Sequence, residues 1–269
     1  MRSQNPRPLV MGVVNVTPDS FSDGGRWATP EAVRDHALRL ADAGADILDI
    51  GGESTRPGSA RVTQAEELDR VIPLIAGVRA RTSVAISIDT MKPLVARAAV
   101  AAGATIWNDI TALRHAPDSL GIAAALGCEV VLMHMQGEPG TMQAAPRYGD
   151  VVAEVIAFLA ARAEAAMAAG VARDRIWLDP GIGFGKHPLD HNLPLLAGLE
   201  RIVGLGFPVL LGASRKRFIG MLDGDATEEA RLGGSIAAAL RGADAGVAAV
   251  RGHDVSETVQ ALKVWAAMR

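Results

Sequence analysis

Short apolar runs alternate along the chain with longer segments in which apolar residues recur at helical spacing. Eight runs have the length and composition of strands that are buried on both faces, and a helix-like segment follows each of them. Eight such alternations in 269 residues, with no linker or charge block between them, predict a single-domain α/β protein with the (β/α)8 TIM-barrel fold. The strands are expected at about 9–15, 46–51, 84–89, 105–109, 129–134, 175–179, 208–213 and 246–251.

Several helical segments carry their own start and stop signals. Thr63 and Glu66 have the spacing of a capping box at the start of the second helix, and Gly170 is a typical stop for the fifth. The segment of residues 1–8 is short and polar, which predicts a flexible lead-in to a barrel domain that spans residues 9–269. The third to seventh helices are expected near 93–102, 117–126 and 150–169, after Pro188, and from about Thr227.

Polar residues stand at the end of five of the eight apolar runs. A single acid or amide in such a place can be explained by capping of a neighbouring helix, because Asp and Asn are preferred caps. Capping does not predict a recurrence at five strand ends, whereas in a parallel barrel these ends share the face at which ligands bind. The pattern therefore predicts one shared polar site. Its candidates are Asn15, Glu53, Asp89, the pair Asn108 and Asp109, and Asp179.

The segment from Asp179 to Lys186 is unusual for a connecting loop. Pro180 cannot continue the hydrogen bonding of the strand, and the three glycines that follow allow a sharp turn or the close approach of a ligand. An Asp at the end of a buried strand is costly unless it has a partner. We therefore expect Asp179 to belong to the shared site.

Two further loops are long and rich in small polar residues. The loop from Asn15 to Gly25 combines hydroxyls with acids, which suits a mobile lid over a metal-bound anion but is also common in solvated loops. In the loop from Gly51 to Gly58, Thr55 and Arg56 can donate to an anion or a polar substrate. The alternative for this second loop is a turn with a surface arginine.

Basic side chains follow the last two predicted strands, where barrels frequently place phosphate sites. These loops contain Lys216, Arg251 and His253, which supply up to three positive charges. Each alone would more often face solvent, but two basic motifs in this pair of loops favour anion binding. The predicted mouth then has an acidic half and a cationic half, which suits a donor-rich heterocycle with a negatively charged leaving group.

Composition excludes several other classes of protein. The net charge of −3 argues against a broad surface for nucleic acid. The one cysteine, Cys128, excludes an internal disulfide and precedes an apolar run, so we expect a buried, unreactive thiol. The chain has no apolar span of about 18 residues and no N-terminal signal pattern, so a cytoplasmic protein with no membrane partner is expected.

Together the motifs resemble those of the dihydropteroate synthase family nearly from end to end. All eight matching segments occur in the expected order, and the first two are long and highly specific. They are NVTPDSFSDGG from Asn15, DIGGESTRPG from Asp49, SIDT from Ser87, ND at Asn108, LMHMQG from Leu132, DPGIGFGK from Asp179, GASRKR from Gly212 and RGHD from Arg251.

The resemblance implies a transferase of folate biosynthesis with the barrel fold already expected. Such an enzyme condenses (7,8-dihydropterin-6-yl)methyl diphosphate with 4-aminobenzoate to give 7,8-dihydropteroate and pyrophosphate. The resemblance also implies Mg²⁺ as cofactor and a homodimer formed through the later helices. The aminobenzoate site is where sulfonamides would compete.

Matching positions carry the family's functional residues onto this chain. The pterin would be held by Asp89, Asn108, Met133, Asp179 and Lys216. The diphosphate would be bound by Asn15, Thr55, Arg56, Arg251 and His253, with the metal at Asn15. The aminobenzoate would be surrounded by Pro57, Phe184 and Ser214. The catalytic residues would be Lys216, Arg251 and His253, with Asp23 as a helper from the first loop.

No nucleophile is paired with a base in these motifs, and none is needed if the carbon–oxygen bond breaks first. The cations and magnesium would then stabilise the departing pyrophosphate, while Asp89 and Asp179 stabilise the pterin methylene cation. Arg217 stands where many relatives carry a small hydroxyl residue, so it either alters the carboxylate contact or faces solvent. Met135 and Met142 are expected to pack.

Three other functions fit part of the pattern. A methyltransferase-type barrel that binds methyltetrahydrofolate would share the acids and the amide but would not need the cationic half. A non-catalytic pterin-binding paralogue is expected to lose the acids of the first loop or Lys216, and neither is lost. A sugar-phosphate isomerase barrel predicts a catalytic Glu or Lys at a strand end and leaves the recurring acids and amides unexplained.

Overall fold

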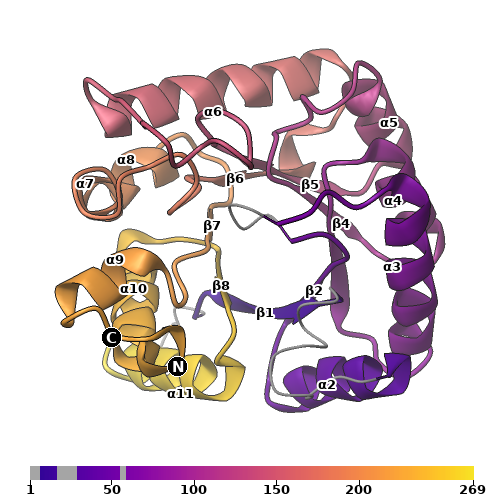
Figure 1. Ribbon diagram of the computed structural model, residues 1–269, viewed down its shortest axis with the longest axis horizontal. Helices are drawn as coiled ribbons and strands as arrows, with labels where there is room; N and C mark the ends of the chain where they lie inside the picture. The colour runs from indigo at the N-terminus through magenta and orange to yellow at the C-terminus, as the bar shows by residue number, and fades with distance from the viewer. Residues whose placement is uncertain (1–6, 17–28, 55–58) are drawn as a thin grey trace.

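The chain folds into a barrel of eight parallel strands with helices around it, as Figure 1 shows. The eight parallel strands and the helices outside them confirm the predicted TIM barrel. The structure is a computed structural model and describes residues 7–16, 29–54 and 59–269. Its strands are β1 (Leu9–Asn15), β2 (Ile47–Gly51), β3 (Ala85–Asp89), β4 (Ile106–Asp109), β5 (Glu129–Met133), β6 (Ile176–Asp179), β7 (Leu210–Leu211) and β8 (Ala249–Gly252).

The strands are hydrogen-bonded in the order β6-β5-β4-β3-β2-β1-β8-β7. The two ends of this sheet meet through a parallel bridge between Leu178 and Val209, and the Leu178 N–H donates to the carbonyl oxygen of Pro208 at 2.9 Å. The seventh strand is shorter than predicted, because Pro208 has no N–H to donate and the chain leaves the sheet after Leu211.

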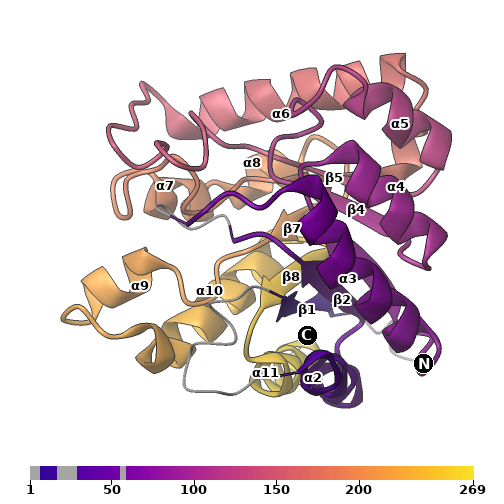
Figure 2. The same cartoon turned by 45° about the vertical axis from the view of Figure 1, so that its right-hand side comes forward.

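The helices form an outer ring, and α2 and α11 lie side by side against β1 (Figure 2). Thr63 and Glu66 form the predicted capping box, and Gly170 has φ +103°, as expected after a helix stop. The helices are α2 (Pro30–Asp42), α3 (Gln64–Arg79), α4 (Pro93–Ala101), α5 (Ser119–Leu126), α6 (Val151–Ala168), α7 (Asn192–Ala197), α8 (Leu199–Val203), α9 (Arg217–Leu222), α10 (Leu232–Ala245) and α11 (Val255–Ala267).

One predicted boundary is wrong. The helix expected from Thr227 begins at Leu232, because residues 228–230 form a separate 3₁₀ turn with Thr227 at its N-terminus. The lead-in expected to be flexible through residue 8 includes Arg7, which is paired with Asp46 at 2.7 Å. Residues 1–6 lie outside the described part of the chain.

Side chains that face the barrel interior form two layers, an apolar one and, above it, one that contains polar and charged residues. Six apolar residues from six strands pack together as a floor, namely Met11, Ile47, Ile106, Val131, Leu210 and Ala249. Side chains alternate along a strand, so the residue two positions further also faces inward. In these strands that second layer consists of Val13, Asp49, Asn108, Met133, Gly212 and Arg251. The strands therefore place Asp49, Asn108 and Arg251 directly above a closed apolar floor.

No described helix is long and apolar enough to cross a membrane.

Candidate active site

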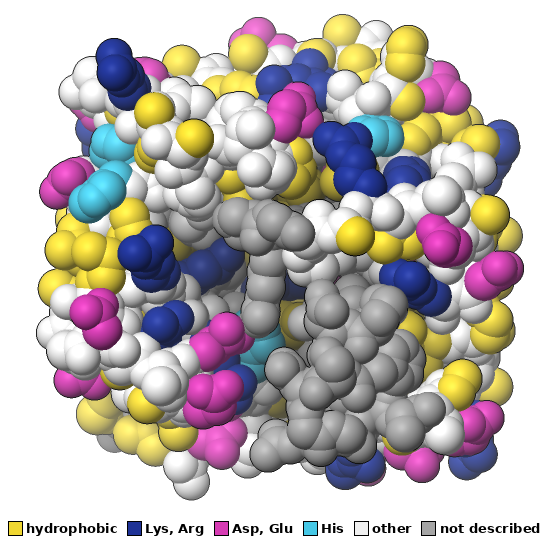
Figure 3. Space-filling model, in the orientation of Figure 1, with side chains coloured by type: hydrophobic (Ala, Val, Ile, Leu, Met, Phe, Trp, Pro, Cys, Tyr) yellow, Lys and Arg dark blue, Asp and Glu magenta, His cyan; other side chains and the backbone are white. Residues whose placement is uncertain are grey.

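A cavity of about 680 Å³ opens at the carboxyl ends of the strands. Figure 3 shows it as a hollow near the middle of the face, with basic and histidine side chains inside. All eight strands contribute residues at or just beyond their ends to its wall, from Asn15 after β1 to His253 after β8. A cavity of this size matches the usual volume of a site for a small molecule.

The structure brings most of the predicted site residues to this one cavity. Asn108 and Asp179 are almost fully buried, at 4% and 5% exposed, and Asn15 stands exposed at the rim. The loops that carry Asp23, Thr55, Arg56 and Pro57 lie outside the described residues. The remaining predicted residues in the wall are Asp89, Met133, Phe184, Ser214, Lys216, Arg251 and His253.

The acidic and cationic halves of the predicted site are not separate. The guanidinium of Arg251 donates from Nε to Asp49 Oδ2 at 2.6 Å and from Nη2 to Asp89 Oδ2 at 2.8 Å. Burial and the neighbouring charge of Asp49 raise the pKa of Asp89 to about 7, although Arg251 opposes the shift. The structure therefore corrects the picture of two opposed halves, because Arg251 lies among the acids.

Asp49 is a site residue that sequence reasoning missed. It is fully buried, and its Oδ2 also accepts from Asn108 Nδ2 at 3.2 Å. Its Oδ1 has no hydrogen-bond partner among the described residues. The available signal was an acid in the middle of the apolar strand β2, two residues beyond inward-facing Ile47.

One predicted strand-end acid does not join the site. Asp109 is fully buried, and its carboxylate accepts from the backbone N–H groups of Thr111 at 2.7 Å and Leu113 at 2.8 Å. Burial raises its pKa to about 6. Local capping, which was the alternative for any one strand-end acid, is therefore the right explanation at this position.

The low pKa of His253 favours the neutral ring, so Lys216, Arg251 and His253 supply two positive charges out of the expected maximum of three. Burial, together with the nearby charge of Arg251, lowers the pKa of His253 to about 3. Its Nδ1 lies 3.1 Å from Ser214 Oγ, and that hydroxyl also accepts from the His253 N–H at 3.3 Å. A charged His253 therefore requires an anion beside it.

The turn after β7 orients Lys216 into the cavity. Arg215 adopts φ +57°, a sparsely populated region, and is held there by Asp254 through Nε at 3.1 Å. The Arg215 N–H also donates to Ser235 Oγ at 2.9 Å. As a result the ammonium of Lys216 lies 4.4 Å from the centre of the Phe184 ring. Arg217 is exposed and also lines the cavity, so it faces solvent at the cavity mouth.

One part of the cavity wall is lined by flexible apolar side chains. Met135 and Met142 are buried in a cluster with Met133 and Ile110, as expected for packing residues, and Met142 also reaches the cavity. Cys128 is buried, and desolvation raises the pKa of its thiol to about 11, which agrees with the predicted unreactive cysteine.

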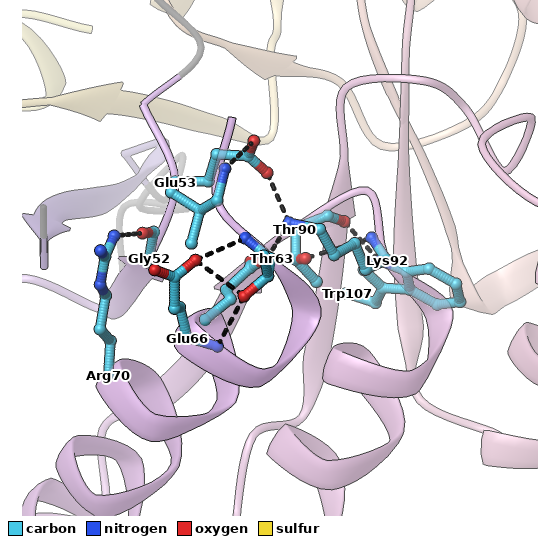
Figure 4. Close-up of polar contacts among 10 residues, drawn as sticks. Gly52, Glu53, Thr63, Glu66, Arg70, Thr90, Lys92 and Trp107 are labelled. Atoms are coloured by element: carbon cyan, nitrogen blue, oxygen red, sulfur yellow. Dashed lines mark hydrogen bonds and ion pairs between the residues drawn. The ribbon is translucent and has the colours of Figure 1, made fainter. Parts of the chain in front are cut away.

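A network of charged side chains anchors the loop after β2, as Figure 4 shows. The ammonium of Lys92 is bonded to Glu53 Oε2 at 2.6 Å and to Glu67 Oε2 at 2.5 Å. Glu53 Oε1 accepts from the Val62 N–H at 3.1 Å, and Arg70 donates to the carbonyl oxygen of Gly52 at 2.9 Å. The start of this loop is thus bonded to its end and, through Arg70 and Lys92, to α3 and the beginning of α4, which the sequence had not indicated.

Replacing Lys92 by Met is expected to lower the free energy of unfolding by about 3 kcal/mol. The reason is that Glu67, which is fully buried, and the mostly buried Glu53 would be left without a counter-charge. Urea unfolding measures the change. The same substitution at the exposed Lys263 is the control, and equal midpoints for the two variants would contradict the expectation.

Comparison with known proteins shows similarity along almost the whole chain. A family model described as pterin binding enzyme matches residues 11–253. The dihydropteroate synthase of Escherichia coli strain K12 is 49% identical over 257 residues, which cover 96% of this chain and 90% of that protein.

Two solved structures of the dihydropteroate synthase of Xanthomonas albilineans are also similar. The one with 4-aminobenzoic acid is 55% identical with a TM-score of 0.91 and covers 97% of this chain and 93% of that chain. The complex with 7,8-dihydropteroate is 53% identical with a TM-score of 0.88 and covers 97% of this chain and 94% of that chain.

Proposed function

This chain belongs to the dihydropteroate synthases among the pterin-binding enzymes, and from that premise we propose how its cavity performs the family's reaction. The enzyme is a transferase that joins a pterin diphosphate to 4-aminobenzoate, giving 7,8-dihydropteroate and pyrophosphate. The observation that carries the proposal is the convergence of Asp89, Asn108 and Asp179 with Lys216 and Arg251 around one cavity.

The pterin lies deep in the cavity, over the acids. Asp179 accepts two parallel hydrogen bonds from the N–C–N edge of the ring, and Asn108 both donates and accepts. Met133 and Ile110 supply apolar surface beneath the ring. Burial raises the pKa of Asp179, but the Gly181 N–H at 2.6 Å and the charge of Lys216 oppose that shift and favour the carboxylate.

The reaction proceeds through breakage of the carbon–oxygen bond before attack by the amine. Lys216 and Arg251 place positive charge in the wall of the cavity, where it can meet the negative charge that gathers on the leaving pyrophosphate. Asp89 and Asp179 stabilise the pterin methylene cation that remains. A dissociative route needs no activated nucleophile, and the Ser214 hydroxyl, 3.1 Å from Nδ1 of His253, is assigned to the surroundings of the aminobenzoate.

Magnesium is part of this proposal. Asn15 fits such an ion because it is exposed at the end of β1, lines the cavity and carries an amide oxygen. No three described His, Cys, Asp or Glu residues are grouped to hold a metal, so phosphate oxygens and water would complete the shell. A bound ion there supplies further positive charge to the diphosphate.

The aminobenzoate approaches from the rim, between Phe184 and Ser214, both of which line the cavity. Sulfonamides of the same shape compete there. A methyltransferase-type use of the cavity is less well supported, because it leaves Lys216 and the turn that orients it without a role. A sensor that only binds pterin would keep the deep acids but would release no pyrophosphate.

Incubation of the enzyme with the pterin diphosphate, 4-aminobenzoate and Mg²⁺ tests the proposal. Dihydropteroate and pyrophosphate are expected in equal amounts, and both should fall when Mg²⁺ is removed by a chelator. Pterin binding without product formation would identify a sensor instead. Pterin binding measured without aminobenzoate separates these two outcomes.

Anion binding is expected to depend on the protonation of His253. Sulfate, which does not titrate between pH 5 and 7, should bind more tightly as pH falls, by up to about tenfold per unit. The pKa of His253 is about 3 without an anion, and an adjacent negative charge raises it, so binding takes up a proton. Calorimetry in buffers of different ionisation enthalpy measures that proton. The His253→Asn variant should lose it, and identical proton uptake in both proteins would exclude this role.

We also propose a cytoplasmic homodimer. The exposed apolar side chains of Leu232 on α10 and of Val264 on α11, with Met268 just beyond α11, are consistent with an interface formed by the later helices. Sedimentation velocity at micromolar concentration tests the oligomeric state.

A further inference from the structure

Lys186, the last residue of the segment that begins at Asp179, is completely buried. None of the described carboxylates forms an ion pair with its ammonium. A charged amine removed from water in this way is costly unless other polar groups replace the water. No step of the proposed reaction uses Lys186, so its burial calls for a different explanation.

The ammonium of Lys186 is surrounded by acceptors from two different loops. On the β6 side it donates to the carbonyl oxygens of Gly181 at 2.9 Å and Phe184 at 3.0 Å. On the β5 side it lies 2.9 Å from Nδ1 of His134 and 3.3 Å from the carbonyl oxygen of the same residue. The side chain thus joins the loop after β6 to the end of β5.

These two loops touch backbone to backbone, which explains why a cation is needed between them. A Cβ on Gly181 would lie 1.9 Å from the carbonyl oxygen of His134, and one on Gly185 would lie 2.2 Å from that of Gln136. Both glycines have positive φ, +66° and +59°. The close approach brings the carbonyl oxygens of His134, Gly181 and Phe184 to within 3.3 Å of one point, and the ammonium there offsets their mutual repulsion through charge-assisted hydrogen bonds.

His134 is in the right state to accept from Lys186. Burial, followed by the charge of Lys186, lowers the pKa of the His134 ring to about 3. The ring is therefore neutral, and its Nδ1 lone pair is available to an ammonium.

The loops joined by Lys186 carry the pterin end of the cavity. The Gly181 N–H donates to Asp179 Oδ1 at 2.6 Å, and the His134 N–H donates to the carbonyl oxygen of Asp179 at 2.9 Å. The ring of Phe184, on the aminobenzoate side, has its own contact with the ammonium of Lys216. Lys186 therefore contacts the backbone that sets the position of Asp179.

We propose that Lys186 is a positioning residue of the reaction, whose ammonium locks the β5 and β6 loops so that Asp179 is presented to the pterin. The inference rests on the proposed use of the cavity. It does not make Lys186 a catalytic residue, because its ammonium is enclosed by the protein's own carbonyls.

The Lys186→Met variant tests this role, with Lys263→Met as the matched control on the exposed face of α11. The KM for the pterin diphosphate is expected to rise about tenfold to a hundredfold, since a small misplacement has effects of this size. The KM for 4-aminobenzoate at saturating pterin should change less than threefold. An unchanged pterin KM in a folded variant, or equal rises in both KM values, would overturn the proposal. Inactive wild-type enzyme would instead refute the proposed function.

A measurement on the wild-type enzyme covers the case in which Lys186→Met does not fold. Burial lowers the pKa of Lys186 to about 7, while Asp179 opposes and Lys216 assists that shift. If the charged form organises the pterin site, binding of 6-hydroxymethylpterin must raise this pKa, because the coupling is reciprocal. Carbon-13 labelling at the lysine Cε positions follows the titration by NMR, and a pKa that stays unchanged on binding would overturn the proposal.

Discussion

Replacing Asp179 by Asn is expected to lower kcat/KM for the pterin diphosphate about a hundredfold, which corresponds to roughly 3 kcal/mol. The amide still accepts from the Gly181 N–H with one oxygen. Its NH₂ group, however, now faces the donor edge of the pterin, so one hydrogen bond is replaced by a contact between two donors. The negative charge that stabilises the methylene cation is lost as well.

The fold should tolerate this substitution. Burial raises the pKa of Asp179, so the protein gains little stability from its charge, and a neutral group of the same shape should change the unfolding free energy by less than about 1 kcal/mol. Steady-state kinetics and calorimetric binding of 6-hydroxymethylpterin measure the functional loss. The control is Asp190→Asn, at an exposed carboxylate in the same segment between β6 and α7. Unchanged kinetic constants in the Asp179 variant would refute its role.

Replacing Arg251 by Met is expected to reduce both stability and activity. Asp49 is fully buried and Asp89 largely so, and without Arg251 these two carboxylates on the adjacent strands β2 and β3 would lose their shared counter-charge. Removing one partner of a buried ion pair typically costs about 3–5 kcal/mol. The activity should fall a further hundredfold or so, because the charge that meets the leaving pyrophosphate disappears.

A second substitution separates the two effects of Arg251. Asp49→Asn in the Arg251→Met background removes one of the unpaired charges, so it should restore part of the urea midpoint without restoring activity. Arg201→Met, at an exposed arginine on α8, is the control for the substitution itself. Equal recovery of stability and activity would show that Arg251 acts only through the fold.

Much of the fold followed from local patterns. Each strand is a short apolar run and each helix has its own spacing or cap, so element type depends on residues that are neighbours in sequence. Parallel topology then places every strand end on one face, which is why Asp89, Asn108 and Asp179 were correctly expected at one mouth. The exceptions were segments such as β7, where Pro208 limits the hydrogen bonding.

Contacts between distant segments could not be derived in this way. Arg251 meets Asp49 across 202 residues of sequence, and Lys186 meets His134 across 52. No neighbouring residue marks these side chains as different from others of their type. Which side chain each of them meets depends on how the strands are staggered around the closed barrel. The anchoring of Glu53 and Glu67 by Lys92 has the same origin.

The amino-acid sequence by itself determined the barrel, the face on which the site lies and most of the side chains that line it. Only the tertiary structure decided which of those side chains carry charge and which are paired. His253 is neutral and Arg251 lies among acids, because a group's charge depends on how far the surrounding chain removes it from water and which charges stand beside it. Both are properties of the packed molecule, which no run of neighbouring residues contains.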